Sequence, residues 1–237
     1  MPASFLVQCS DPCQNIPELK EEVKTLVKLL MDYGVSFFIT TKGDPSFLLE
    51  LQGFIEYEPK LIATTIEGTA EILQLLSPGA LPFDARVTWV RKVSRLGIDT
   101  VIRLDPVFIH LFQALYGDSW FDKIAELIGL FASTGAKHII SSTGRLSKRR
   151  SAYHKGISIW QQIYKVIHTQ SPLAAKRFEQ EYAYEAPWSG GGYHLHKDLR
   201  LSFHDSLREL VEAKGMTYAT CQELSAEESD SPGIPKL

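Results

Sequence analysis

The chain has 237 residues, of which 44% are hydrophobic and 22% charged, and its formal net charge is −3. These values fit a globular protein with one large domain or two small ones, and they exclude a global attraction to nucleic acid. No segment approaches the roughly 18 apolar residues that span a bilayer, the N-terminus lacks a signal-peptide pattern, and the odd count of three cysteines favours a reducing cytoplasm over a disulfide framework.

The first elements alternate between strand and helix. The apolar run at 4–9 predicts a strand, and the segment at 16–34 predicts a helix because its apolar residues fall on one face. Pro17 suits the first helical turn. Gly34 suits the left-handed conformation that ends a helix, and the run at 35–41 then predicts the next strand.

The same unit of helix, glycine and short β-rich run recurs along the chain. The helices predicted after the first are at 83–97 and 119–135, with Asp84 and Ser119 in opening positions. The glycines that end the repeated helical stretches are Gly34, Gly97, Gly135 and Gly215. The predicted strands are 4–9, 35–41, 60–66, 98–105, 136–142 and 216–221.

This alternation predicts an α/β fold with right-handed crossovers and a parallel sheet. It favours a partial (β/α) barrel over an open doubly wound sheet, since no G-x-G-x-x-G turn opens any helix. We expect one domain at 1–224, in which 144–194 is a basic helical and loop insertion before the last helix and strand. The acidic tail at 225–237 is expected to be disordered.

Polar residues cluster where the predicted strands end, the region where α/β barrels carry their chemistry. The five ends read Cys9-Ser10-Asp11, Thr40-Thr41-Lys42, Thr64-Thr65 followed by Glu67, Arg103 with Asp105, and Ser141-Ser142-Thr143. Each end alone could reflect only solvent exposure and turn formation. Together they predict a pocket for a small ligand with carboxylate and hydroxyl groups.

Arg103 is the most informative of these residues, because it lies between apolar neighbours in "VIRLDP". An unpaired guanidinium would be costly there. We therefore expect an anionic partner for Arg103, either Asp105 or a ligand carboxylate.

Three segments resemble the radical S-adenosylmethionine (SAM) proteins of the spore photoproduct lyase-like group, which is also called the DNA repair photolyase-like group. They are "ITTKGDPSFLLEL", "IATTIEGTAEILQLLSPGALPFDARVTWVRKVSRLGID" and "VIRLDPVF", and the resemblance runs from about residue 5 to 224. It implies a partial (β/α)6 barrel with a C-x-x-x-C-x-x-C loop. In that family three thiolates of the loop hold a [4Fe–4S] cluster, whose fourth iron binds SAM.

The sequence departs from the family at this loop. Cys9 and Cys13 match C-x-x-x-C, but Ile16 stands where the third ligand would be, and no such triplet occurs in these residues. The segment around Cys9 resembles the family's second strand, so we expect the chain to be truncated after the cluster loop, with the first strand missing. Such a chain would be inactive alone unless an upstream segment complements it, and its exposed barrel edge would favour a dimer.

The resemblance also implies contacts to SAM. Ser10 and Asp11 would face its amino group, and Lys42 would pair with its carboxylate. Cys9 could donate a hydrogen atom to a substrate radical, as spore photoproduct lyase does with a cysteine at this strand end, or it could be an ordinary packed thiol.

The remaining contacts implied by the resemblance lie on later strands. Thr65, with Glu67 as a weaker candidate, would bind the ribose hydroxyls. Arg103 would bind the SAM carboxylate together with Lys42 or would face the substrate, and Ser141 would lie near the adenine of SAM.

A basic segment follows the fifth strand. Arg145, Lys148, Arg149 and Arg150 could contact a nucleic-acid backbone, or they could form a solvated surface. The histidines of "YHLHKDLRLSFH" match neither zinc helix pattern, so we expect no metal site there.

Three functions remain open from the sequence. The first is a truncated radical SAM protein that keeps the SAM pocket. The second is a cluster-free protein that binds SAM or nucleic acid. The third is an unrelated barrel enzyme that uses Lys42, Asp105 and Glu67 as acid and base groups.

Overall fold

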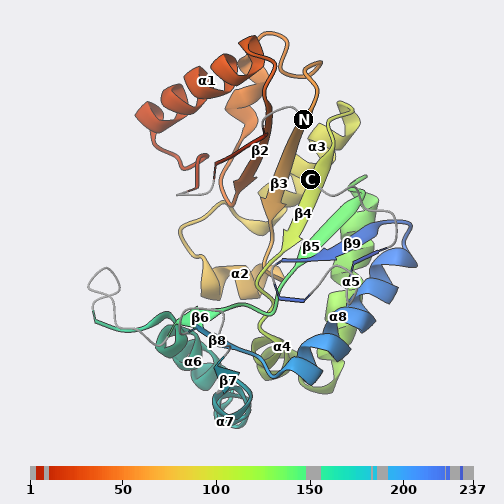
Figure 1. The fold of residues 1–237 in the computed structure, drawn as a ribbon. Helices are drawn as coiled ribbons and strands as arrows, with labels where there is room; N and C mark the ends of the chain where they lie inside the picture. The colour runs from red at the N-terminus through yellow and green to blue at the C-terminus, as the bar shows by residue number, and fades with distance from the viewer. Residues whose placement is uncertain are drawn as a thin grey trace.

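The computed structural model describes residues 4–7, 11–147, 156–182, 184–185, 192–221, 223–224 and 230–231. Six strands form one sheet in the order β1-β2-β3-β4-β5-β9, and every neighbouring pair is parallel (Figure 1). These strands are β1 (Ser4–Val7), β2 (Ser36–Thr41), β3 (Lys60–Thr65), β4 (Thr100–Leu104), β5 (His138–Ser141) and β9 (Thr217–Thr220). All six coincide with predicted strands.

Helices connect and cover these strands. The α-helices are α1 (Pro17–Asp32), α2 (Ala70–Leu76), α3 (Phe83–Arg95), α4 (Ile109–Tyr116), α5 (Trp120–Ser133), α6 (Ile159–Gln170), α7 (Pro172–Glu181) and α8 (Lys197–Glu212). Two short 3-10 turns are η1 (Ser46–Glu50) and η2 (Gly117–Ser119). The four glycines expected to end helices, Gly34, Gly97, Gly135 and Gly215, all have positive φ, at 66°, 79°, 90° and 75°. This confirms their predicted role, because only glycine adopts that conformation without strain from a Cβ atom.

The core lies between one face of the sheet and the helices. Ile39, Ile62, Ile102, Ile139 and Tyr218 share that face and are at most 2% exposed. They belong to one apolar cluster with buried residues of α3, α5 and α8, which lie along one side of the sheet (Figure 1). Burial of this face fixes the strand register, because a shift by one residue would turn its apolar side chains outward.

The predicted partial barrel is confirmed in its parallel α/β architecture, and in the described residues the sheet is open. β1 and β9 form its two edges and do not pair with each other. The outer edge of β1 has no partner strand within the part of the chain that the structure describes. Dimerisation through this edge stays a prediction.

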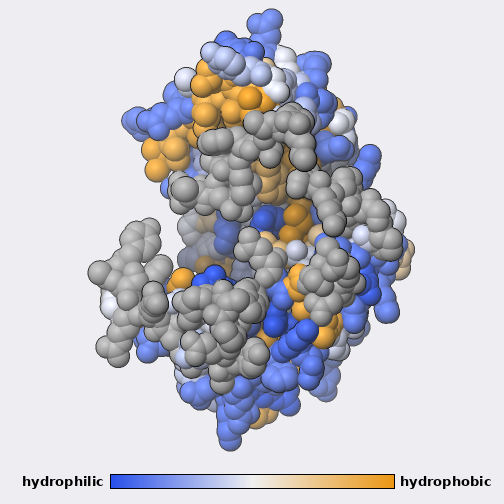
Figure 2. Space-filling view, viewed as in Figure 1, coloured by the Kyte–Doolittle hydropathy of each residue, from blue (hydrophilic) through white to orange (hydrophobic). Residues whose placement is uncertain are grey.

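The predicted insertion lies beyond the C-terminal ends of the strands. It contains α6, α7 and a small antiparallel sheet of β6 (Leu146–Ser147), β8 (Gly192–His194) and β7 (Tyr184–Glu185) (Figure 1). The surface is hollowed between this part and the sheet, and hydrophilic residues are exposed in the hollow (Figure 2). None of the described helices has the length and apolar composition needed to cross a membrane.

Two residues of the acidic tail are placed against the main sheet. The Ser231 amide donates to the Tyr218 carbonyl at 2.8 Å, and the Tyr218 amide donates to Ser231 Oγ at 2.9 Å. The Thr220 amide donates to Asp230 Oδ1 at 3.0 Å. These contacts satisfy backbone groups on the free edge of β9, which would otherwise be open to another strand.

Candidate functional site

The parallel strands bring the predicted polar residues to one edge of the sheet. Thr65 is in register with Arg103, and Leu104 is in register with Ser141. Lys42 directly follows β2 at the same edge. The carboxyl ends of parallel strands necessarily meet at one edge, so residues far apart in sequence become neighbours there.

The two faces of the sheet separate these residues further. Side chains alternate along a strand, and residues in register share a face, so Thr65 and Arg103 point to the face opposite the helices. Ser141 points to the helix-covered face and is 0% exposed. The next residue, Ser142, is the serine whose side chain lines a cavity.

Asp11 ties the loop after β1 to the end of β2. Its Oδ1 accepts hydrogen bonds from the Cys13 amide at 2.9 Å and from Thr41 Oγ1 at 2.6 Å. Its Oδ2 accepts one from the Lys42 amide at 2.6 Å. In this arrangement Asp11 shapes the backbone from which Lys42 projects. Gly43 packs against the same loop, because a Cβ there would lie 2.0 Å from the Cys13 carbonyl oxygen.

Glu67 is the centre of a buried ionic cluster. Its Oε1 forms an ion pair with the Lys42 ammonium and accepts from Ser77 Oγ at 2.8 Å, while its Oε2 pairs with Arg86 Nη1 at 2.8 Å. The side chains of Glu67 and Arg86 are 0% exposed. Burial alone would raise the pKa of Glu67, but the charges of Lys42 and Arg86 and the Ser77 hydroxyl lower it below the usual value.

A second cluster surrounds Arg103 and confirms that this residue has an anionic partner. Arg103 Nη2 pairs with Asp105 Oδ2, and Ser142 Oγ donates to Asp105 Oδ1. Arg103 Nη2 also donates to the Cys221 sulfur at 3.2 Å. Burial opposes the charge of Arg103, but Asp105 and Cys221 raise the pKa of the guanidinium above its usual value. The group therefore remains a cation at the strand ends.

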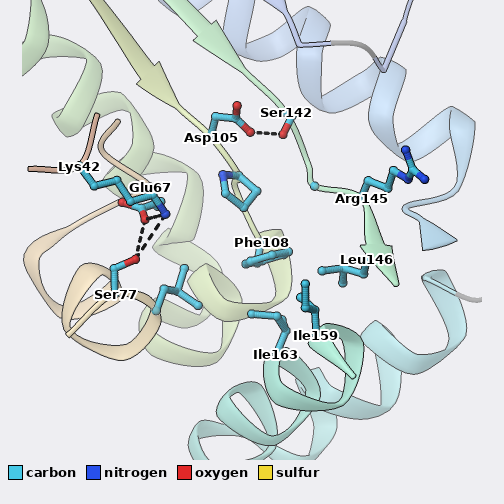
Figure 3. A pocket seen from close by; sticks show the side chains of 13 residues that line it. Lys42, Glu67, Ser77, Asp105, Phe108, Ser142, Arg145, Leu146, Ile159 and Ile163 are labelled. Atoms are coloured by element: carbon cyan, nitrogen blue, oxygen red, sulfur yellow. Dashed lines mark hydrogen bonds and ion pairs between the residues drawn. The ribbon is translucent and has the colours of Figure 1, made fainter. Parts of the chain in front are cut away.

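Two cavities adjoin Lys42. The first, of about 330 Å³, has Lys42, Glu67 and Ser77 on the side opposite Leu146, Ile159 and Ile163 (Figure 3). Its polar lining is Lys42, Glu67, Ser77, Asp105, Ser142 and Arg145, and its apolar lining includes Leu76, Phe108, Leu146, Ile159 and Ile163. The second, of about 670 Å³, is lined by Lys42 and by residues of the Asp11 loop, the 42–44 loop and 79–82. Lys42 therefore stands on the wall shared by both cavities.

The donor set next to Lys42 suits SAM. A lysine ammonium can pair with a carboxylate, and the apolar side of the first cavity can cover a planar ring. The side chain of Lys42 is 39% exposed, whereas the carboxylate that holds it is fully buried. Lys42 is therefore the partner of this ion pair whose side chain is partly exposed at the cavity wall.

Two described cysteines, Cys13 and Cys221, are free thiols. Burial raises the pKa of Cys13 to about 12. Burial also raises the pKa of Cys221. Within the described ranges, no three His, Cys, Asp or Glu side chains are grouped to hold a metal ion.

Several predicted site residues lie outside the described residues, namely Cys9, Ser10, Lys148, Arg149 and Arg150. Other residues at the site were not singled out from the sequence. Arg86, Ser77 and the apolar wall of α6 carry no local signal for function, because an arginine, a serine and isoleucines on a helix are ordinary in that context. The block "LLSPGALPFDARVTWVRKVSRLGI", the most specific part of the resemblance, did contain both Ser77 and Arg86.

The fold and this edge define a class of protein, an open parallel α/β sheet with polar residues gathered at the C-terminal ends of its strands. No protein-family model matches the chain. A "radical SAM Nα-GlyT isomerase" of Pseudomonas phage M6 is 23% identical over 224 residues, which cover 93% of this chain and 42% of that protein.

The particular fold is that of a solved spore photoproduct lyase mutant with bound AdoMet and dinucleoside spore photoproduct. It matches with a TM-score of 0.60 and 16% identity, over 92% of this chain and 60% of that chain. The resemblance to radical SAM proteins is thereby confirmed. The chain spans less than two thirds of the length of both relatives.

Proposed function

We propose that these residues form the SAM-binding and substrate-facing end of a radical SAM protein that resembles spore photoproduct lyase. One observation carries the proposal. Lys42 lines both cavities, and it lies at the C-terminal edge of a parallel sheet whose fold is shared with a protein that binds AdoMet.

The residues around Lys42 have distinct roles in this proposal. Lys42 pairs with the carboxylate of SAM, while Asp11 fixes the backbone of the loop and Glu67 with Arg86 holds the lysine side chain at the wall. Thr65 and Arg103 lie at the same edge, on the sheet face opposite the helices. When bound, SAM with its cluster supplies a carbon radical, and the chain's own part is to bind and orient the reactants.

The cluster is assigned no ligands among these residues. The sequence holds no C-x-x-x-C-x-x-C triplet. We therefore expect the 237-residue chain to bind SAM without cleaving it. An acid–base role for Glu67 is disfavoured, because its lowered pKa keeps it ionised and its oxygens are already paired.

A calorimetric titration with SAM tests the role of Lys42. Lys42→Met keeps the length of the side chain and removes its charge, and we expect about a tenfold loss of affinity, equal to about 1.4 kcal/mol. Lys28→Met, at a lysine of α1 whose side chain is 67% exposed, is the matched control. Equal affinities for the Lys42 variant and the native chain, or no binding by the native chain, would contradict the proposal.

A nucleotide is the substrate class that the first cavity favours. The wall of the cavity and the ion pairs directly behind it contain four cationic side chains and two carboxylates, so the local formal charge is +2. The cations are Lys42, Arg86, Arg103 and Arg145, and the carboxylates are Glu67 and Asp105. The chain as a whole carries −3. A base could pack against the apolar wall while Arg145, at the rim, contacts a phosphate. The solved relative binds a dinucleoside.

A further inference from the structure

The cavity wall includes a segment that a distant carboxylate holds in place. We call residues 142–146 the cavity loop; Ser142, Gly144, Arg145 and Leu146 line the first cavity. Thr143, at the centre of the loop, is 0% exposed and is not one of the residues that line the cavity. Its contacts explain how the loop keeps its shape.

The polar groups of Thr143 are all engaged. Its amide donates to Glu223 Oε2 at 2.8 Å, and its Oγ1 donates to the same carboxylate at 3.0 to 3.1 Å. Its carbonyl accepts a hydrogen bond from the Tyr182 hydroxyl. Thr143 is thus fixed from the segment after β9 on one side and from the end of α7 on the other.

Glu223 is a buried anion with a dedicated partner. It is 6% exposed and accepts a hydrogen bond from His204 Nε2 at 3.0 Å, while His204 Nδ1 contacts the Tyr218 hydroxyl at 2.5 Å. Burial alone would raise the pKa of Glu223, but His204 and Thr143 lower it, so the carboxylate stays ionised at neutral pH. A buried charge is costly unless it is fully paired, and here His204 and the amide and hydroxyl of Thr143 supply the pairing.

The residues of the cavity loop that follow Thr143 are closely packed against their neighbours. Gly144 has a φ of 88°, and a Cβ there would lie 2.9 Å from Pro106 Cβ and 3.0 Å from a ring carbon of Phe108. The Arg145 side chain crosses Gly192 so closely that a Cβ on that glycine would lie 2.6 Å from Arg145 Nε. A displacement of Thr143 would therefore be passed on to Arg145.

We propose that Glu223 is a positioning residue of the cavity, because through Thr143 it sets the cavity loop and so places Arg145 at the rim. The ligand that Arg145 meets rests on the proposed function. The positioning of the loop does not depend on it. A purely structural role for Glu223 would lower global stability without a specific effect on the loop.

Matched substitutions separate these roles. Thr143→Val removes the hydroxyl and keeps the side-chain volume, whereas Thr143→Ser keeps both donors to Glu223. Glu223→Gln removes the charge, and Glu212→Gln makes the same change at a carboxylate that accepts instead from Ser231 Oγ. All four are made in the full 237-residue chain.

Hydrogen exchange gives the first readout, and it needs no ligand. We expect amides of the cavity loop to exchange about tenfold faster in Thr143→Val and Glu223→Gln, a larger factor than for amides of α1 and β2. Thr143→Ser and Glu212→Gln should exchange like the native chain in this loop. Unchanged loop exchange in Glu223→Gln, or an increase by the same factor in the loop, α1 and β2, would overturn the positioning role.

Titration with thymidine 5′-phosphate, thymidine and ribose 5-phosphate gives the second readout. We expect Glu223→Gln to weaken the two phosphate-bearing probes several-fold and to leave thymidine unaffected. In an Arg145→Gln background the effect should vanish, since Glu223 acts through Arg145. A loss of equal size in that background would show that Glu223 does not act through Arg145. If the native chain binds none of the probes, the nucleotide proposal fails, and the hydrogen-exchange result alone decides the positioning role.

Discussion

The ammonium group of Lys42 is paired with the carboxylate of Glu67, and the two groups differ sharply in burial: the Lys42 side chain is 39% exposed and that of Glu67 is 0% exposed. Arg86, also 0% exposed, holds the other oxygen of Glu67 at 2.8 Å. The pair therefore presents one accessible cation at the cavity wall and keeps its anion out of reach of solvent.

Removing the charge of Glu67 should strongly destabilise the fold. Glu67→Gln leaves the buried guanidinium of Arg86 without an ion pair, and we expect a loss of about 3 to 5 kcal/mol in the free energy of unfolding, measured by urea denaturation. Glu50→Gln breaks an exposed pair with Lys24 and should cost under about 1 kcal/mol. A loss of similar size in both variants would contradict the central role of the buried cluster.

Stability should fall in acid because of two buried carboxyls. The pKa values of Glu67 and Glu223 are lowered from 4.5 in the folded state, so their ionisation stabilises the fold above pH 4.5. That stabilisation is lost as the pH falls below 4.5 through the folded-state pKa values. Urea denaturation from pH 7 to pH 3 should show this decline, and it should be shallower in Glu223→Gln. An identical slope in that variant would exclude a contribution from Glu223.

Two glycines of the larger cavity should respond differently to alanine. In Gly43→Ala the new Cβ would lie 2.0 Å from the backbone oxygen of Cys13, so we expect the loop to shift at a cost of about 1 to 3 kcal/mol. The Cys13 thiol should then react faster with a thiol reagent. Gly79→Ala, with nothing within 4 Å of the new Cβ, is the control and should behave like the native chain. Slow labelling of Cys13 in both variants would argue against a tight loop.

Arg145 should contribute to the salt dependence of any single-stranded DNA binding. Arg145→Gln should lower the slope of log K against log salt by about 0.7, the share of one phosphate contact. Arg95→Gln changes another exposed arginine, the last residue of α3, and serves as the control. An unchanged slope in Arg145→Gln, measured by fluorescence anisotropy, would remove this arginine from the interface.

The sequence by itself determined the six strands of the main sheet and the four helix ends at glycine. A short apolar run is buried on one or both faces of a sheet, and a glycine that ends a helix adopts a positive φ, so both features follow from neighbouring residues. The expected partner of Arg103 also followed from local context, because a cation between apolar neighbours needs an anion and Asp105 is two residues away.

Only the tertiary structure decided which polar groups at the strand ends remain accessible. It turned Ser141 toward the helices and Ser142 toward the cavity, and it paired Glu67 with Arg86. It also brought Glu223 to Thr143 across 80 positions of sequence. Such pairings depend on chain segments that meet only when the sheet has assembled, and no local periodicity encodes which distant charge will satisfy a buried donor.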